Sequence, residues 1–265
     1  MKRYLFYFCF LSALASSCGG EHKSDVPKLQ EDAKAKQLLQ GIWLNDEAGD
    51  VAFKVKGDTI YYPDTTSMPV SFQIFSDTLV LHGAKSTKYP IVKQSAHIFV
   101  FANQNGDQVK LIKSEDDADD YFFEGMKVRP LNQNKLIKRD TIVVYGEDKY
   151  HCYVQVNPTT FKVVTSSYND EGVAVDNIYH DNIIHLSIFK GAAKVFSSDF
   201  RKQDFRHYVS KNILDEAILS DLLFNKIDKN GIIYTAVLGI GDSNMSYEVS
   251  VIIGFDGKIR IKEEK

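Results

Sequence analysis

The sequence is poor in cysteine, proline and tryptophan, and it carries no excess of basic residues. Three cysteines are too few for the dense disulfide framework of small secreted domains. The formal net charge of -3, with Lys and Arg scattered along the chain, gives no reason to expect a nucleic-acid partner. With 44% hydrophobic and 25% charged residues, the composition also excludes a disordered protein and allows a sizeable core in one or two domains.

Long apolar runs are missing as well, because no run after residue 15 approaches the roughly 20 residues of a membrane-spanning helix. The apolar stretch at residues 4–15 is shorter than that and follows Lys2 and Arg3. A basic start, a short apolar segment and then small residues are the order of a secretory signal peptide. We therefore predict that residues 1–17 are a signal peptide rather than a membrane span.

Residues 14–20 read LASSCGG, with small residues on both sides of Cys18. This resembles the lipobox of bacterial lipoproteins, whose cysteine takes a diacylglyceryl group. The family usually has a large aliphatic residue three places before the cysteine, where this chain has Ala15 and places Leu14 one step earlier. The resemblance implies cleavage before Cys18 and a lipid anchor, palmitate included, in a membrane of the bacterial cell envelope. We expect the outer membrane and leave the membrane face open; the alternative is an ordinary secreted protein in which Cys18 is incidental or paired.

The chain after Cys18 divides into four parts. Residues 18–36 are small, polar and charged and are expected to be a tether, with a short helix within residues 28–40. Residues 37–128 contain about seven short β-type runs separated by turns such as Asn105-Gly106, which predicts an antiparallel meander or barrel. Residues 129–138 are polar and basic and are expected to be a linker.

Residues 139–265 are expected to form a second β-rich domain with one or two helices. Helical spacing of apolar residues predicts helices within 200–209 and 212–224. Turns at Asn230-Gly231 and Asp256-Gly257 predict hairpins near the end of the chain. The predicted fold class is therefore α+β, mainly antiparallel β.

The tripeptide Gly41-Ile42-Trp43 contains the single tryptophan and stands just before the meander. It resembles the Gly-x-Trp signature that opens the first strand of lipocalin-like barrels. In that family the tryptophan closes one end of the barrel and an apolar ligand enters the other, which implies structural roles for Gly41 and Trp43. The alternative is a core tryptophan in another small β-barrel or sandwich.

Candidate metal ligands are few. His151 and Cys152 are adjacent on a predicted strand and therefore face opposite sides, so they cannot readily share a metal ion. His180 and His185 are five residues apart and face opposite sides of a continuous strand unless the chain turns between them. We expect Cys152 to be a buried free thiol, and we expect no metal and no cofactor.

Two other segments contain residue types that metal or phosphate sites use. Residues 114–120 are rich in carboxylates, but they lack the ligand spacing of an EF-hand, so a solvated acidic loop is expected over a calcium site. Residues 239–243 are glycine-rich but are followed by no helix, so they are expected to be a turn rather than a phosphate-binding loop. No nucleophile motif is present, and no catalytic residue is predicted.

Residues 139–265 resemble an uncharacterised lipoprotein family of the Bacteroidetes, described only as a domain of unknown function. The resemblance rests on Tyr179-His180-Asp181-Asn182, on Phe189-Lys190-Gly191, on residues 196–205 and on Ile227-Asp228 with the hairpins that follow. It implies a cell-envelope lipoprotein and conveys no catalytic residue.

The leading hypothesis for function is a lipid-anchored, non-enzymatic module that binds a small ligand, a glycan or an envelope protein. It rests on 17 Phe and 14 Tyr residues, more than a minimal core requires. Exposed aromatic side chains would favour a sugar or protein ligand, whereas a deep apolar barrel mouth would favour a lipophile. The alternatives are a hydrolase without a recognisable motif and a structural component of an envelope assembly.

Overall fold

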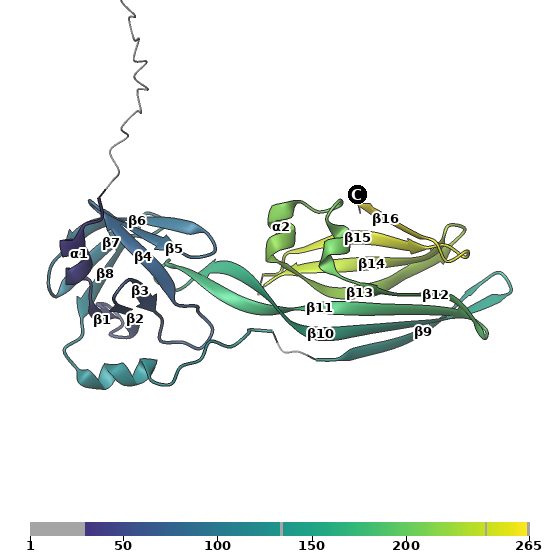
Figure 1. Cartoon of the computed structure of the whole chain (residues 1–265), viewed down its shortest axis with the longest axis horizontal. Coiled ribbons are helices and arrows are strands. Elements are labelled where there is room, and N and C mark those ends of the chain that lie inside the picture. The colour runs from purple at the N-terminus through teal and green to yellow at the C-terminus, as the bar shows by residue number, and fades with distance from the viewer. Residues whose placement is uncertain (1–29, 133–134, 242, 264–265) are drawn as a thin grey trace, which may run out of the picture. The chain divides into compact units, whose positions relative to one another are not determined.

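A computed structural model describes residues 30–132, 135–241 and 243–263 (Figure 1). The described chain is mainly antiparallel β-structure, which confirms the predicted fold class. Its helical elements are short, namely α1 (Ala33–Leu38), η1 (Asp117–Phe123), η2 (Lys202–Phe205) and α2 (Lys211–Glu216). The predicted signal peptide and Cys18 lie outside the described residues.

Eight strands form a closed barrel, in which each strand pairs with the next and β8 returns to β1. They are β1 (Gly41–Asn45), β2 (Val51–Lys56), β3 (Thr59–Tyr61), β4 (Val70–Phe75), β5 (Thr78–His82), β6 (Ser86–Gln94), β7 (Ile98–Ala102) and β8 (Gln108–Lys113). The predicted turn at Asn105-Gly106 joins β7 to β8, and Gly106 has the positive φ of 89° that such turns favour. The sequence predicted about seven strands, and β1 is the one that closes the barrel.

Alternation of apolar and polar residues explains why these segments form the barrel. In β4, Val70, Phe72 and Ile74 are buried, whereas Ser71 is exposed and Gln73 partly exposed. Side chains two residues apart share one face of a strand, so the apolar set points inward. The barrel core is therefore made of the same period-2 pattern that predicted the strands.

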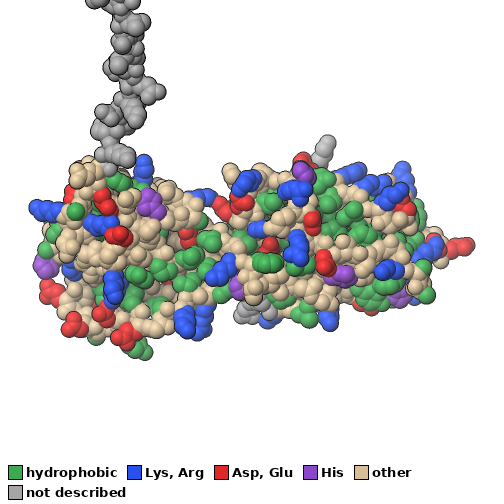
Figure 2. All heavy atoms as spheres, in the orientation of Figure 1, with side chains coloured by type: hydrophobic (Ala, Val, Ile, Leu, Met, Phe, Trp, Pro, Cys, Tyr) green, Lys and Arg blue, Asp and Glu red, His purple; other side chains and the backbone are tan. Residues whose placement is uncertain are grey.

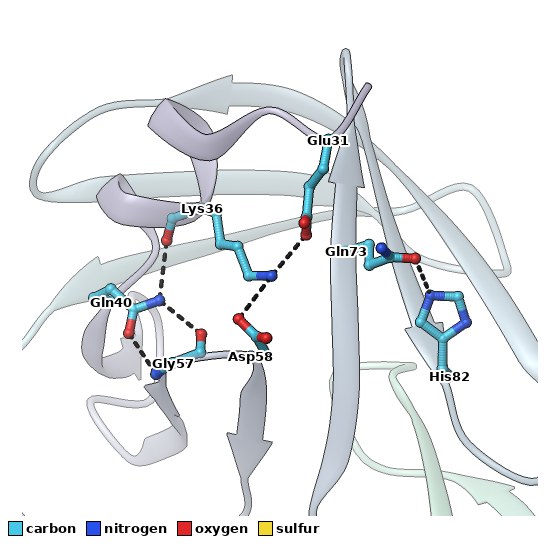
Figure 3. A network of polar contacts seen from close by, with 7 residues as sticks. All are labelled: Glu31, Lys36, Gln40, Gly57, Asp58, Gln73 and His82. Carbon is cyan, nitrogen blue, oxygen red and sulfur yellow. Dashed lines mark hydrogen bonds and ion pairs between the residues drawn. The ribbon is translucent and has the colours of Figure 1, made fainter. Parts of the chain in front are cut away.

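Helix α1 is fixed to the barrel by a network of polar contacts (Figure 3). Lys36 bridges Glu31 at 2.7 Å and Asp58 at 2.8 Å. Gln40 donates to the carbonyl of Gly57 at 3.0 Å and accepts from its N–H at 2.8 Å. Burial alone would lower the pKa of Lys36, but its bonds to Asp58 and Glu31 outweigh that and raise it. Residues 31–36, which the sequence assigned to the tether, thus lie on the barrel.

The second half consists of two four-stranded antiparallel sheets with the orders β12-β11-β10-β9 and β13-β14-β15-β16. Buried side chains of both sheets form one hydrophobic core, all of it drawn from residues 143–261. The strands are β9 (Ile137–Tyr145), β10 (Asp148–Tyr168), β11 (Ala174–Lys190), β12 (Ala193–Phe200), β13 (Ala217–Asp228), β14 (Gly231–Ile240), β15 (Ser246–Ile253) and β16 (Ile259–Glu263).

Strands β10 and β11 form a long hairpin whose tip belongs to the barrel. Val173 and Val175 are buried in the barrel core. Between them, the N–H of Ala174 donates to the Tyr89 hydroxyl at 2.7 Å, and the Tyr62 hydroxyl donates to the Ala174 carbonyl at 3.2 Å. The barrel therefore depends on side chains that come from the second half of the chain.

The predicted linker at residues 129–138 is bonded to its surroundings where the structure describes it. The N–H of Arg129 donates to the carbonyl of Thr65 at 2.7 Å. Asn132 donates to the carbonyl of His180 at 2.7 Å and accepts from its N–H at 2.8 Å. Strand β9 already begins within the predicted linker, at Ile137.

The helix predictions were largely wrong. Within residues 212–224 only the start is helical, in α2, and the chain enters β13 at Ala217. The β13–β14 register shifts between Leu219 and Asp221, so apolar residues that match helical spacing also match a bulged strand. Within residues 200–209 only the short η2 forms, and residues 193–200 form the unpredicted strand β12.

Candidate functional site

The barrel interior is filled by aromatic side chains. The ring centroids of Trp43 and Phe99 lie 5.9 Å apart, those of Phe99 and Phe101 5.5 Å, and those of Tyr89 and Phe101 5.6 Å. All four side chains are at most 1% exposed. The space in which a lipocalin holds its ligand is therefore occupied by core packing, which argues against a lipophile in this barrel.

Trp43 and Gly41 occupy structural positions at the end of the barrel beside α1. The Trp43 indole Nε1 donates to the carbonyl of Leu39 at 2.7 Å, and the Lys113 ammonium lies 5.0 Å from the ring centroid. Gly41 has a φ of 113°, which L side chains rarely adopt, where the chain turns from α1 into β1.

The four predicted soft ligands do not come together. Cys152 is a buried free thiol, as predicted, and burial raises its pKa, partly offset by the Tyr234 hydroxyl. His151 stands opposite Phe189, and His180 and His185 lie at separate positions of β11. In the described part of the chain no three His, Cys, Asp or Glu side chains are grouped closely enough to hold a metal ion.

The carboxylates of the acidic segment are used within the chain. Asp116 accepts a hydrogen bond from the Ala118 N–H at 2.8 Å and caps η1. Asp119 accepts from the Ser114 hydroxyl at 2.5 Å, and Asp120 pairs with Lys54. These contacts account for the segment as local structure.

A cleft lies at a bulge in the long hairpin. Pro158 stands opposite Asn182 and Lys162 opposite His180, so three residues of β10 face the single residue Asp181. Proline has no N–H to donate to the sheet. The Thr159 hydroxyl takes over, donating to the Asp181 carbonyl at 2.7 Å and accepting from the Phe161 N–H at 3.1 Å. Such bulges redirect side chains.

The cleft has a volume of about 310 Å³ and is built from three segments of the chain. Its lining residues are Phe161, Lys162, Val163, Asp181, Asn182, Ile183, Arg201, Lys202 and Gln203. The lining thus includes three basic residues and one acidic residue. On the face drawn in Figure 2, basic and acidic side chains are interspersed.

Lys202 is the unusual member of this group, because only 9% of it is exposed. Its ammonium donates to the carbonyl of Ala217 at 2.9 Å. Burial lowers its pKa, although Asp181 and Asp215 act in the opposite direction. Within the described chain neither Lys202, Lys162 nor Arg201 forms an ion pair.

Asp181 does not neutralise the cleft by direct pairing. Its Oδ1 accepts from the N–H groups of Leu219 at 2.8 Å and Asn182 at 2.9 Å, which ties β11 to β13. Buried lysines are rare unless they are paired. The residues that line the cleft therefore carry an excess of positive charge, which would suit an anionic ligand.

A second polar cluster lies on the outer face of the first sheet. His185 Nδ1 lies 2.6 Å from Asp199 Oδ1, and its Nε2 lies 2.9 Å from the Ser187 hydroxyl and 3.2 Å from that of Ser197. This is the connectivity of a Ser-His-Asp triad. However, Ser187 lies on β11, which has a partner strand on each side, so the N–H groups near Ser187 are engaged in the ladder rather than arranged as an oxyanion hole. Ser197 lies on the edge strand β12.

The sequence did not predict either group of residues. A signal for the cleft was present in Pro158, which interrupts two β-type runs, and in the adjacent cations Arg201 and Lys202. The triad-like cluster had no local signal, because it joins β11 to β12, and β12 was not predicted.

Residues 116–261 match the family model described as "Domain of unknown function (DUF4738)". The match contains every residue of the cleft and begins before residue 139, where the resemblance seen in the sequence began. It confirms the expected domain of unknown function. No curated protein matches the chain.

Proposed function

Since the chain belongs to the DUF4738 family, whose description names no activity, we propose a function from the chain's own geometry. The protein is a lipid-anchored, non-enzymatic module of the bacterial cell envelope that binds an anionic ligand in the cleft around Lys202.

The observation that carries the binding function is a buried lysine that lines a cavity and has no ion-pair partner among the residues that the structure describes. Taking a charged ammonium out of water is unfavourable, and the hydrogen bond to the carbonyl of Ala217, the C-cap of α2, satisfies only one of its three donors. Lys162 and Arg201 add further positive charge at the same cavity. A bound anion would form charge-assisted hydrogen bonds with these groups and offset the unfavourable burial.

The anchoring part of the proposal rests on the sequence around Cys18. The small residues at 14–20 resemble a lipobox, and lipid on Cys18 would attach the protein to the membrane, which we take to be the outer membrane. Among the described residues, no helix is both long and apolar enough to cross a bilayer.

The anchor is tested by replacing Cys18 with alanine in cells supplied with labelled palmitate. We expect the wild-type protein to take up label and the variant to take up none, because the thiol is the acyl acceptor. A Cys152→Ala variant, which removes the buried thiol instead, should label like the wild type. Equal labelling of Cys18→Ala would contradict the anchor.

The binding function is tested by isothermal titration of the folded protein with phosphate, sulfate and simple carboxylates. We expect Lys202→Met to weaken binding of any anion that binds by about tenfold or more, the loss typical of a charge-assisted hydrogen bond. Lys229→Met removes an exposed lysine in a turn outside the cleft and serves as the matched control. If none of these anions binds, or if both variants behave alike, the proposed function is wrong.

A hydrolase is the second candidate, and the cluster of His185, Asp199, Ser187 and Ser197 is the observation that favours it. Its test is labelling with a fluorophosphonate probe, which reacts with activated serines. Labelling of Ser187 or Ser197 that disappears in His185→Ala would support this candidate. No labelling is the outcome expected for a binding module.

A further inference from the structure

The lining of the cleft indicates a ligand that has an apolar surface as well as a negative charge, because an aromatic residue lines the same cavity as the cations. Phe161 is 57% exposed and lines the cavity from the β10 side of the bulge. An apolar side chain of this size is ordinarily buried, and an exposed ring in a cavity offers a flat apolar surface to a ligand. An inorganic anion would make no use of it.

Neutral polar groups complete the lining. Asn182 donates its side-chain N–H to the carbonyl of Leu219 at 2.9 Å, which holds the amide in place. Gln203 is exposed on η2, and its side-chain amide makes no hydrogen bond within the described chain. Amides both donate and accept, so they suit hydroxyl groups, which do the same. A fatty acid would leave these groups without a role.

The cations are suited to bind a negatively charged group on a ligand that also has a ring and hydroxyl groups. Arg201 presents a planar guanidinium, which binds carboxylates through two parallel hydrogen bonds, and Lys202 lies next to it in sequence at the same cavity. A volume of about 310 Å³ is at the small end of ligand cavities and suits a single ring with its substituents.

We propose that the cleft binds an acidic sugar unit, with its carboxylate on Arg201 and Lys202 and the apolar face of its ring on Phe161. This rests on the proposed anion-binding function and specifies its ligand class. Asn182 and Gln203 then bind ring hydroxyls. The proposal distinguishes a uronic acid from a neutral sugar, which lacks the charge, and from acetate, which lacks the ring.

The test is titration of the whole folded protein with glucuronate, glucose, acetate and phosphate. We expect glucuronate to bind about tenfold more tightly than any of the other three, because only it engages both halves of the cleft. Phe161→Ala should weaken glucuronate binding about tenfold while changing acetate binding less than about twofold. Phe122→Ala removes a ring that is also exposed, at 49%, but lies on η1 outside the cleft, and should change neither.

The outcomes separate the two proposals. If acetate and phosphate bind in a Lys202-dependent way, but glucuronate binds no better and Phe161→Ala has no effect, the anion site stands and the sugar proposal is overturned. If glucose binds as well as glucuronate, the charge is not used, and the sugar proposal is again overturned. If nothing binds, both proposals fall together. A Lys202→Gln variant keeps a hydrogen-bond donor but removes the charge. Its unfolding midpoint, measured in parallel, shows whether a loss of binding is due to misfolding.

Discussion

At the scale of single residues, Lys202 distinguishes a functional site from ordinary structure. A residue kept for stability should lower the free energy of the folded state, yet burial makes the charged form of this side chain unfavourable. Its hydrogen bond to Ala217 and the attraction of Asp181 and Asp215 offset only part of that. The balance between unfavourable burial and these favourable contacts predicts how replacing Lys202 changes stability in the absence of a ligand.

We predict that Lys202→Met leaves the free energy of unfolding at pH 7 unchanged or raises it by up to about 2 kcal/mol. The folded pKa of Lys202 lies below the ordinary value of 10.5 that it has in the unfolded chain. Between these two values the unfolded state binds more protons, so the lysine's unfavourable contribution is largest at neutral pH and fades as pH rises toward 10.5. Urea unfolding at pH 7 and at pH 10 measures both effects. A variant that is clearly less stable at pH 7 would assign Lys202 a structural role.

At the scale of elements, the bulge in β10 decides the shape of the cleft. The Thr159 hydroxyl satisfies the carbonyl of Asp181 and the N–H of Phe161, two backbone groups that the register shift leaves without strand partners. The Thr159 side chain therefore helps to fix the positions of Phe161 and Asp181 at the cleft.

We predict that Thr159→Val destabilises the fold by about 1 to 3 kcal/mol, because the methyl group cannot bond either backbone group. It should also weaken anion binding, since the cleft loses its support. Thr160→Val changes the exposed neighbour in the same way and should do neither. Urea unfolding and titration of both variants provide the comparison, and equal behaviour of the two would show that the hydroxyl does not support the bulge.

The elements also show how far the sequence could predict the fold. The barrel strands followed from period-2 alternation, and the turn at Asn105-Gly106 from its residue types. A strand was predicted at residues 224–228, but the first part of β13 was predicted as helix, because a bulge lets apolar residues satisfy helical and strand spacing alike. Pairing with β14 decides between the two structures. The sequence showed the break after Val156, but it did not show that β10 continues through this break.

The cleft was beyond sequence reasoning for a related reason. Phe161, Asp181 and Lys202 follow one another at intervals of about 20 residues in the chain, and each is ordinary in its own segment. They meet only because β10 and β11 pair with a shifted register and η2 follows β12. Neither the register shift nor the position of η2 has a signature in the local sequence. The grouping of basic residues around a buried lysine is therefore apparent only in the three-dimensional structure.

At the scale of the whole molecule, the two cores depend on each other unequally. The core between the two sheets uses only residues from 143 onward, whereas the barrel core includes Val173 and Val175 from the hairpin tip. Loss of the second half would leave both positions of the barrel core empty. Loss of the barrel would leave the sheet core complete.

We predict that a fragment of residues 139–265 unfolds cooperatively on its own, while a fragment of residues 30–128 is much less stable than the same barrel in the whole chain. Burial of each valine stabilises by roughly 1.5 to 3 kcal/mol, so the barrel fragment should lose several kcal/mol. Circular dichroism during urea unfolding measures both fragments. A barrel fragment as stable as the barrel of the whole protein would contradict the role of the hairpin tip, and a non-cooperative 139–265 fragment would contradict the independent sheet core.

The central claim is that Lys202 faces a site for an anion, and its own protonation reports on that claim. The most direct measurement is an NMR titration of the lysine side chains, with the Lys202 signal assigned by its absence in Lys202→Met, in the absence and presence of saturating anion. We predict a pKa below 10.5 without ligand, because burial disfavours the charged form, and an upward shift with ligand, because a bound negative charge favours it. A Lys202 pKa that does not change with any anion, glucuronate included, would contradict the claim.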